Sequence, residues 1–198
     1  MTRLLVVSHP DEVPGEAQIW QALLERGLER LHVRKPGWTD AAVARLLDQV
    51  PEKYLSRVVV HHRAALVARY PLGGLHVGYR SLPKVPSGTL NDKKSTLSCS
   101  VHSWSEAEDA LSSCDYLLLS PVWDSVSKPG YLQNAALREV PPALRGRPVF
   151  ALGGITEHNV LETMRMGYFG VALLGYFWNE PLRAVERWEA LLKILNTV

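Results

Sequence analysis

Histidines recur at the ends of short apolar runs, together with basic residues. His32 and Arg34 stand two residues apart, so on an extended strand both side chains lie on one face. His61 and His62 are adjacent, so only one of them can face the same way, and we expect it to be His62. If that face is turned to the centre of a sheet or barrel, His32 and Arg34 can both lie near its rim, which favours a functional role; a structural role is the alternative.

Further polar residues lie on or after the later apolar runs. They are His76, Ser98, Ser100 and His102, and then Ser120, Asp124, Ser125, Ser127 and Lys128. For His76 we expect packing between a strand and a helix. For His102 we expect a capping role at the helix that begins near Ser105.

The elements that must position these residues alternate regularly along the chain. Each apolar run is followed by a turn and then by a stretch of helical periodicity, which indicates a parallel sheet covered by helices. The expected strands are 3–8, 30–34, 57–61, 74–77, 96–101, 116–119, 148–152 and 170–174. We predict one domain over residues 1–198, an α/β single (β/α)8 TIM barrel; an open doubly wound sheet is the alternative.

The helical stretches have apolar residues at the spacing of amphipathic helices. They are 16–28, 40–50, 106–111, 157–166 and 182–195, with Thr39 and Asp40 as N-terminal caps of the second. Prolines and charges between residues 81 and 94 predict a short 3₁₀ segment or an irregular turn in place of a fourth helix.

A glycine pair, Gly153 and Gly154, follows the seventh expected strand, and Gly175 follows the eighth. Glycines let backbone amides approach an anion closely, and the loops after the last two strands are the usual phosphate site of a (β/α)8 barrel. These three glycines therefore predict a phosphate site. A tight turn with positive φ is the alternative for the pair.

Composition limits the possible partners. The 198 residues are 46% hydrophobic with a formal net charge of +2 and interspersed charges, which is unlike a nucleic-acid-binding surface. No apolar run is long enough for a membrane span or a signal peptide, so we expect a cytoplasmic protein. Cys99 and Cys114 are expected to be reduced packing residues. Trp123, Phe177 and Trp178 are candidates for a lid or for the interface of a homodimer.

Residues 98–130, SCSVHSWSEAEDALSSCDYLLLSPVWDSVSKPG, resemble a segment of thiamine phosphate synthases and TenI-type thiazole tautomerases. That segment is G-x-S-x-H-s-x-x-E-a, then a-D-Y, then G-P-v-f-x-T-x-(T/S)-K. Three shorter stretches are similar in the same order: LHVRK at 31–35 to q-l-R-e-K, GLHVG at 74–78 to G-v-H-l-G, and LGGI at 152–155 to G-G-I.

The resemblance implies a barrel that binds a small phosphorylated thiazole through the loops after the last two strands. In the synthase, Mg²⁺, basic residues and hydroxyls assist the departure of pyrophosphate from a hydroxymethylpyrimidine ester, and the thiazole nitrogen captures the pyrimidine cation. The resemblance assigns this catalytic assistance to Arg34 and Lys128 and to the hydroxyls of Ser125 and Ser127. Lys35, Ser100 and Ser120 join the glycines as expected substrate-binding residues.

The family's Mg²⁺-binding aspartates are replaced here. Their positions hold 61–63, HHR, and 78–81, GYRS, and the family's strand-two lysine falls at Pro36, beside Lys35. We therefore expect no metal and no cofactor, and a metal-independent thiazole tautomerase with His32 and His62 as candidate acid and base. However, the synthase-like Pro121 stands where the tautomerases have a histidine. A divergent, Mg²⁺-dependent synthase and a non-catalytic thiazole or thiamine phosphate-binding barrel remain as alternatives.

Overall fold

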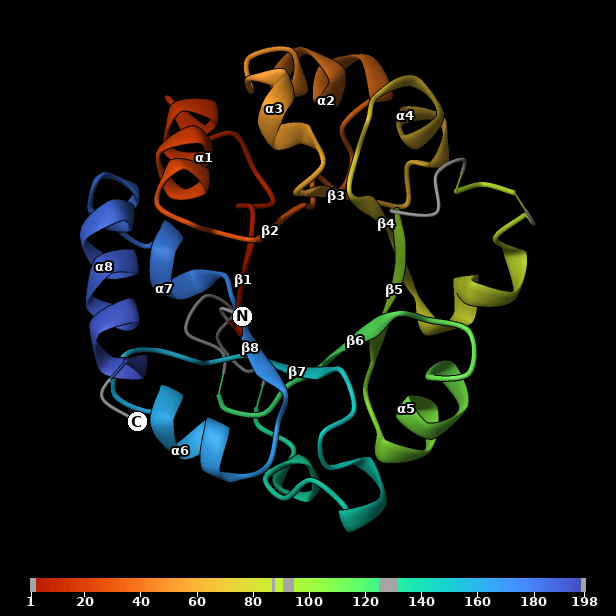
Figure 1. Ribbon diagram of the computed structural model, residues 1–198, viewed down its shortest axis with the longest axis vertical. Helices are drawn as coiled ribbons and strands as arrows, with labels where there is room; N and C mark the ends of the chain where they lie inside the picture. Colours follow the sequence, from red (N-terminus) through yellow and green to blue (C-terminus); the bar gives the residue numbers. More distant parts are fainter. Residues whose placement is uncertain (1–2, 87, 91–94, 125–131, 197–198) are drawn as a thin grey trace.

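Eight parallel strands form a closed barrel with helices outside it (Figure 1). The computed structural model describes residues 3–86, 88–90, 95–124 and 132–196. The strands are β1 (Leu4–Val7), β2 (Arg30–Val33), β3 (Val58–His61), β4 (Gly74–Gly78), β5 (Thr96–Val101), β6 (Tyr116–Leu119), β7 (Val149–Leu152) and β8 (Gly170–Leu173). β1 pairs with β8, Leu5 opposite Ala172, which closes the sheet. The predicted (β/α)8 barrel is confirmed, and the open doubly wound sheet is excluded.

The strands are apolar on both faces because both faces are covered. In β1 all four residues are buried. Leu4 and Val6 belong to the large core cluster that includes the helices, whereas Leu5 and Val7 pack with Tyr116 and other residues inside the barrel. This alternation follows from the pleat, which points successive side chains to opposite faces. Residues at every second position of a strand therefore enter the barrel interior, and those near its C-terminal end reach the site.

The outer layer is made of short helices. They are α1 (Glu16–Glu25), α2 (Asp40–Leu47), α3 (Glu52–Leu55), α4 (Ala64–Arg69), α5 (Trp104–Ala110), α6 (Val160–Arg165), α7 (Gly175–Trp178) and α8 (Ala184–Leu195). Four 3₁₀ segments are η1 (Tyr79–Lys84), η2 (Ala135–Leu137), η3 (Pro142–Leu144) and η4 (Pro181–Arg183). After β4, the segment η1 confirms the prediction of a short 3₁₀ segment where the fourth helix of a regular (β/α)8 barrel would follow the fourth strand. Thr39 caps α2, accepting a hydrogen bond from the Ala42 amide at 3.2 Å.

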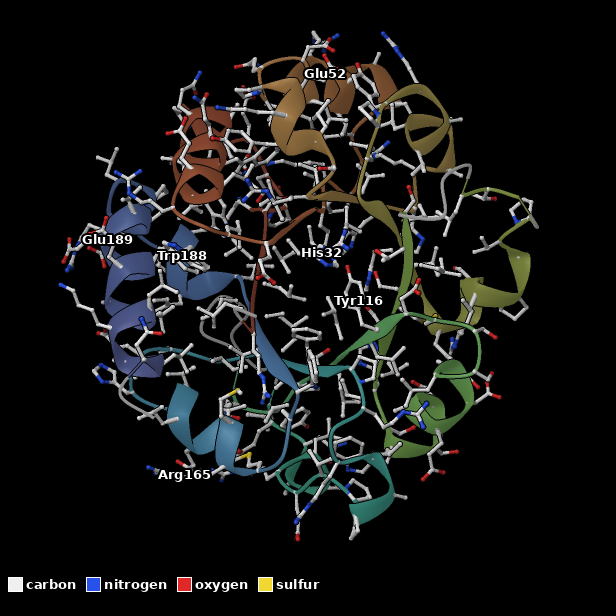
Figure 2. All side chains as sticks on the ribbon, in the orientation of Figure 1. His32, Glu52, Tyr116, Arg165, Trp188 and Glu189 are labelled. Carbon is white, nitrogen blue, oxygen red and sulfur yellow. The ribbon has the colours of Figure 1, made fainter. Side chains whose placement is uncertain are left out.

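Amphipathic helices seal the barrel from outside. Trp20 of α1 and Trp188 of α8 are fully buried, whereas Glu189, the next residue, lies on the outer side of α8 (Figure 2). His32 and Tyr116 lie at the centre of the barrel in the same view. Within the described part of the chain, no helix combines the length and apolar character that a membrane crossing requires.

Two predictions about packing residues can be compared with the structure. Cys99 and Cys114 are free and buried, as expected. Phe177 and Trp178 of α7 are core residues rather than lid residues: Phe177 has no exposed surface, and the Trp178 indole donates a 2.6 Å hydrogen bond to the Val7 carbonyl. Trp123 is half-buried and donates from its indole to Thr163 at 2.9 Å.

Candidate active site

A cavity of about 630 Å³ opens at the C-terminal ends of the strands. Its size suits one or two small organic molecules. The polar residues and glycines that line it are His9, Asp11, Arg34, His61, His62, His76, Gly78, Ser100, His102, Ser120, Gly153, Gly154, Gly175 and Tyr176. Seven of the residues expected from the sequence therefore meet in one cavity: Arg34, His62, Ser100, Ser120, Gly153, Gly154 and Gly175. Ser125, Ser127 and Lys128 lie outside the described residues.

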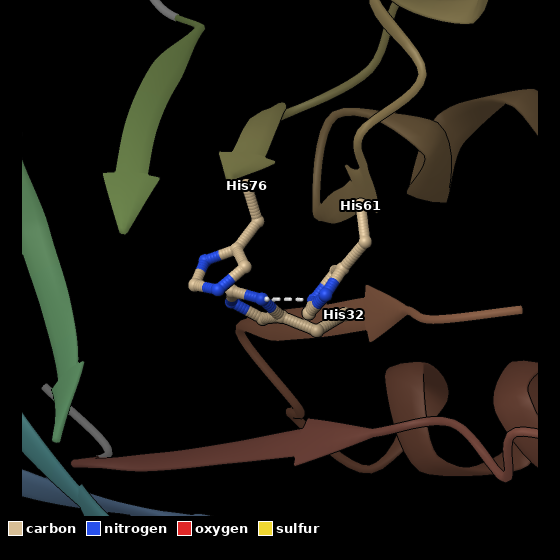
Figure 3. A group of neighbouring side chains, drawn as sticks. All are labelled: His32, His61 and His76. Atoms are coloured by element: carbon tan, nitrogen blue, oxygen red, sulfur yellow. Dashed lines mark hydrogen bonds between the residues drawn. The ribbon is translucent and has the colours of Figure 1, made fainter. Parts of the chain in front are cut away.

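His32 lies beneath this cavity in a polar cluster (Figure 3). Its Nδ1 is 3.1 Å from Nε2 of His61, and the Tyr116 hydroxyl is 2.8 Å from its Nε2. The His32 side chain is completely buried, and burial lowers the pKa of His32 to about 3. A ring that stays neutral and does not line the cavity is poorly placed to exchange a proton with a substrate there.

The prediction that His62, rather than His61, faces the barrel axis is wrong. His61 is the inward residue, and its ring centroid lies 5.3 Å from that of His32 and 4.2 Å from that of His76. Burial, followed by the charges of its neighbours, holds the pKa of His61 well below its ordinary value. His61 is therefore a cavity residue that the sequence analysis missed.

His76 was expected between a strand and a helix, and this expectation is also wrong. Its ring is inside the barrel, 1% exposed, with Nδ1 2.8 Å from the Ser98 hydroxyl and Nε2 2.6 Å from the Ser100 hydroxyl. Burial is again the main cause that lowers the pKa of His76. Because His61 and His76 are register partners on β3 and β4, their rings lie side by side above His32.

His62 reaches the cavity from the turn after β3. Its backbone adopts φ 58°, and its amide donates to the His76 carbonyl at 2.8 Å. This left-handed turn brings the His62 ring to the cavity wall, beside His61, whose ring points toward the barrel axis. Partial burial, then the positive charges of Arg34 and Arg63, lower the pKa of His62, which favours its neutral form.

His102 also lines the cavity, and it does not cap a helix. Its Nδ1 is 2.8 Å from the Ser120 carbonyl. The cap of α5 is Ser103, whose hydroxyl accepts a 3.2 Å hydrogen bond from the Glu106 amide. α5 therefore begins at Trp104, two residues before the predicted start at 106, and the ring of His102 is free to line the cavity.

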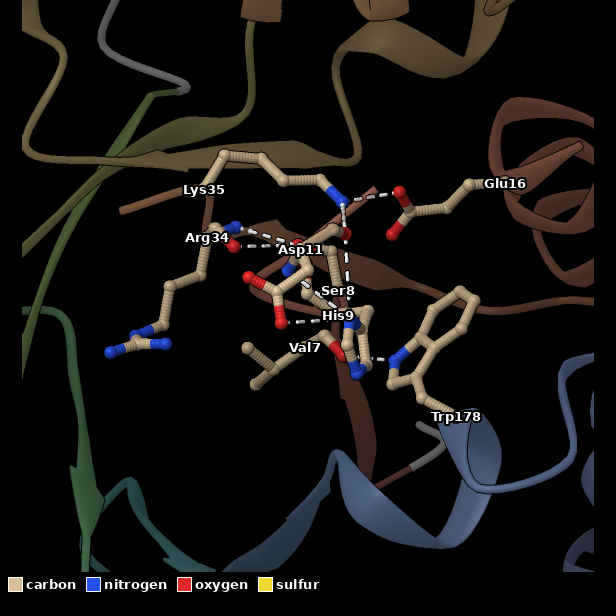
Figure 4. A network of polar contacts seen from close by, with 8 residues as sticks. All are labelled: Val7, Ser8, His9, Asp11, Glu16, Arg34, Lys35 and Trp178. Atoms are coloured by element: carbon tan, nitrogen blue, oxygen red, sulfur yellow. Dashed lines mark hydrogen bonds and ion pairs between the residues drawn. The ribbon is translucent and has the colours of Figure 1, made fainter. Parts of the chain in front are cut away.

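Arg34 provides the positive charge of the site. Its backbone is held by Ser8, whose hydroxyl accepts from the Arg34 amide at 2.8 Å and donates to the Arg34 carbonyl at 3.1 Å (Figure 4). The guanidinium lies at the cavity and makes no hydrogen bond or ion pair with any of the described residues. An unpaired guanidinium on a fixed backbone is well suited to bind an anion.

Lys35 does not line the cavity. Its ammonium forms a buried ion pair with Glu16, with side-chain exposures of 0% and 1%, and donates to the Asp11 carbonyl at 2.7 Å (Figure 4). Burial raises the pKa of Glu16 despite this partner. Because Asp11 lines the cavity, the expected substrate-binding lysine contributes by holding the loop between β1 and α1.

The glycine pair has the geometry that both of its interpretations require. Gly153 and Gly154 have φ of 101° and 63°, so the tight turn is present. Neither amide donates to another described residue. A Cβ at Gly154 would stand 2.2 Å from the Asp124 carbonyl oxygen, so this backbone cannot carry a side chain without moving. The amides of Gly153 and Gly154 have no partner among the described residues, and the glycines carry no side chain that would block an anion. They can therefore bind a phosphate.

Comparison with known proteins agrees with this architecture. The model of the thiamine monophosphate synthase family, TMP-TENI, matches residues 4–176. The chain belongs to this family. A putative thiamine-phosphate synthase of Geobacter sulfurreducens is 27% identical over 163 residues, which cover 81% of this chain and 76% of that protein. A thiamine-phosphate synthase of Listeria innocua is 31% identical over 134 residues, and the match covers 64% of this chain and 62% of the relative.

One solved structure of a known protein is similar to this chain over almost its whole length. The thiamine phosphate pyrophosphorylase of Bacteroides thetaiotaomicron is 32% identical, with a TM-score of 0.79 and coverage of 98% of both chains. The relatives confirm the predicted family and the predicted enzyme of the thiamine pathway. Their names favour the synthase activity over the tautomerase activity that the sequence analysis placed first.

Proposed function

We propose that this protein is a thiamine-phosphate synthase that joins a hydroxymethylpyrimidine pyrophosphate to a thiazole phosphate. One observation carries the proposal: the cavity presents two separate groups of donors that have no partner among the described residues, the Arg34 guanidinium after β2 and the amides of Gly153 and Gly154 after β7. A reaction between two anionic substrates needs two such groups. The names of the relatives support this choice.

The chemistry needs stabilisation of the leaving group. As the carbon–oxygen bond to pyrophosphate breaks, negative charge builds on the departing oxygens, and Arg34 stabilises that charge. The glycine amides hold the thiazole phosphate so that the ring nitrogen faces the pyrimidine cation. Leu118 and Leu152 line the cavity and keep water from the reacting carbon. Lys128, Ser125 and Ser127 are the further groups that the resemblance assigns to pyrophosphate.

The residues present do not fit Mg²⁺. Asp11 is the one carboxylate among the described cavity residues, and its side chain is 83% exposed. Magnesium prefers carboxylate and phosphate oxygens to imidazole or guanidinium. The described lining residues therefore do not fit a magnesium pyrophosphate complex, and no step of the proposed reaction is assigned to magnesium.

A second candidate function is the proton shift of a thiazole tautomerase. The observation in its favour is the set of histidine rings that line the cavity: His9, His61, His62, His76 and His102. Among them His62 is a neutral base that is still partly exposed. Its ring could remove the proton whose loss makes the thiazole aromatic.

One experiment separates the candidates. The protein is incubated with hydroxymethylpyrimidine pyrophosphate and thiazole phosphate, with and without EDTA, and thiamine phosphate is measured by chromatography. We expect product from the two substrates. If the chain forms no thiamine phosphate but aromatises the non-aromatic thiazole tautomer, it is a tautomerase. If it binds thiazole phosphate and converts neither substrate set, both catalytic proposals are refuted and the non-catalytic alternative remains.

A further inference from the structure

A cluster of three histidines that the proposed reaction does not use lies at the cavity: His61 and His76 line it, and His32 lies beneath them. His32, His61 and His76 come from the adjacent strands β2, β3 and β4, and one ring nitrogen of each lies within 4.8 Å of the others (Figure 3). The closest pair, Nδ1 of His32 and Nε2 of His61, is 3.1 Å apart. Nitrogens bound to one tetrahedral zinc ion at 2.0–2.1 Å are about 3.3 Å apart.

We propose that His32, His61 and His76 bind a divalent transition-metal ion of the zinc class, with an open coordination position that faces the cavity. Strands hold the three rings, so the ligands need only side-chain movements of about 1–2 Å to close on an ion. Imidazole is a ligand for zinc, cobalt, nickel and copper, in contrast to the oxygen ligands that magnesium takes. The site therefore differs from the magnesium site implied by the resemblance.

The protonation state of the cluster suits metal binding. A ligating imidazole must be neutral, and burial disfavours the charged form of all three rings. Tyr116 can accompany a change of tautomer at His32: with the metal on Nδ1, the proton moves to Nε2 and is donated to the Tyr116 oxygen. The Tyr116 hydroxyl, 2.8 Å from Nε2 of His32, can either donate or accept this hydrogen bond.

Two serine hydroxyls orient the His76 ring, as the Tyr116 hydroxyl orients His32. Ser98 is fully buried at Nδ1, whereas Ser100 at Nε2 is half-buried and lines the cavity. The ion would replace the Ser100 hydroxyl, which can rotate toward the cavity. Hydrogen bonds of this kind from the second nitrogen of a ligating histidine fix its orientation and tune its affinity for metal.

The charge of the cluster indicates what the open position would bind. Three neutral imidazoles leave the two positive charges of the ion uncompensated, and Arg34 adds another positive charge nearby. An anionic oxygen, from hydroxide or from a phosphorylated ligand, is the group that would complete the coordination.

The test is a metal titration of the whole chain. Protein stripped with a chelator and dialysed is titrated with Co²⁺ and its visible spectrum recorded, and Zn²⁺ affinity is measured by competition with a chromogenic chelator. We expect one ion per chain and the intense visible bands of cobalt in a site without inversion symmetry. His61→Asn should weaken binding at least 100-fold, and Tyr116→Phe should weaken it by roughly tenfold. His158→Asn, at an 86% exposed side chain, is the matched control and should bind normally.

Three outcomes overturn the proposal: no stoichiometric binding by the unaltered chain, equal binding by His61→Asn, or loss of binding in His158→Asn. Circular dichroism of each variant shows whether it folds. If His61→Asn does not fold, the stoichiometry and spectrum of the unaltered chain and the affinity of Tyr116→Phe decide. If no metal binds, the cluster is a structural hydrogen-bond network. Thiazole phosphate binding, measured separately, remains a test of the proposed function alone.

Discussion

The buried ion pair of Lys35 and Glu16 allows a quantitative prediction. Both side chains are almost completely buried, and Oε1 of Glu16 has no hydrogen-bond partner among the described residues. Lys35→Met removes the cation and leaves a carboxylate in an apolar site. Breaking such a pair costs about 3–5 kcal/mol, whereas an exposed pair contributes about 1 kcal/mol or less. For a chain of this size, this loss lowers Tm by roughly 6–20 °C.

The pH dependence of this loss follows from Glu16. Burial raises the pKa of Glu16 above its ordinary value of 4.5, and loss of Lys35 raises it further because a neighbouring cation favours the charged form. A carboxyl whose folded pKa exceeds its unfolded pKa destabilises the fold at pH values above the folded pKa. This penalty decreases as pH falls through the folded pKa and is gone below the unfolded pKa. The difference in stability between Lys35→Met and the unaltered chain should therefore shrink from pH 7 to pH 5.

The assay is urea unfolding followed by circular dichroism, with the single variants Lys35→Met and Glu16→Gln and the double variant. Because no charge remains buried in the double variant, it should lose roughly 1–3 kcal/mol less than the sum of the single losses. Glu189→Gln, which breaks the exposed pair with Arg26, is the control. The buried pair is refuted if the free energy of unfolding of Lys35→Met lies within about 1 kcal/mol of that of the unaltered chain. It is also refuted if the losses of the two single variants simply add in the double variant.

Three further predictions concern the cavity. Arg34→Ala should lower kcat/KM for thiamine phosphate formation by roughly 10²–10³-fold with little change in Tm, since the guanidinium has no described partner; a normal rate would refute its role. Gly154→Asp should abolish thiazole phosphate binding in calorimetry through repulsion and a clash with the Asp124 carbonyl, whereas Gly146→Ala, also at positive φ but with open space around it, should bind normally. His62→Asn should lower any tautomerase turnover by roughly 100-fold with binding unchanged. His32→Asn should instead lower the stability of the fold, because the His32 ring is buried and does not line the cavity. Equal kinetic losses in two equally stable variants would contradict this division.

Local sequence pattern was sufficient for the framework. Strands of a parallel barrel are buried on both faces, so they form continuous apolar runs that end at polar or glycine residues, and each predicted strand agrees with the structure to within a residue or so at its ends. The helices agree less closely. α1 ends at Glu25 rather than near residue 28, because the backbone turns at Gly27 with φ 91°. The glycine pair after β7 was found because its position in the order of strands carries the information.

The interior of the barrel was decided by tertiary structure. Alternation along a strand shows that His61 and His62 point to opposite sides, but only the register of β3 against β4 shows that His61 is the one beside His76. Tyr116 meets His32 across the barrel, 84 residues away along the chain, and no local pattern encodes that distance. Lys35 pairs with Glu16 rather than with a substrate, and this contact between residues 19 positions apart is likewise not encoded by local pattern. The sequence by itself determined which residues end strands, because that depends on neighbours in the chain. Which of these residues share a cavity or bury each other's charges depends on closure of the sheet, which brings distant strands together.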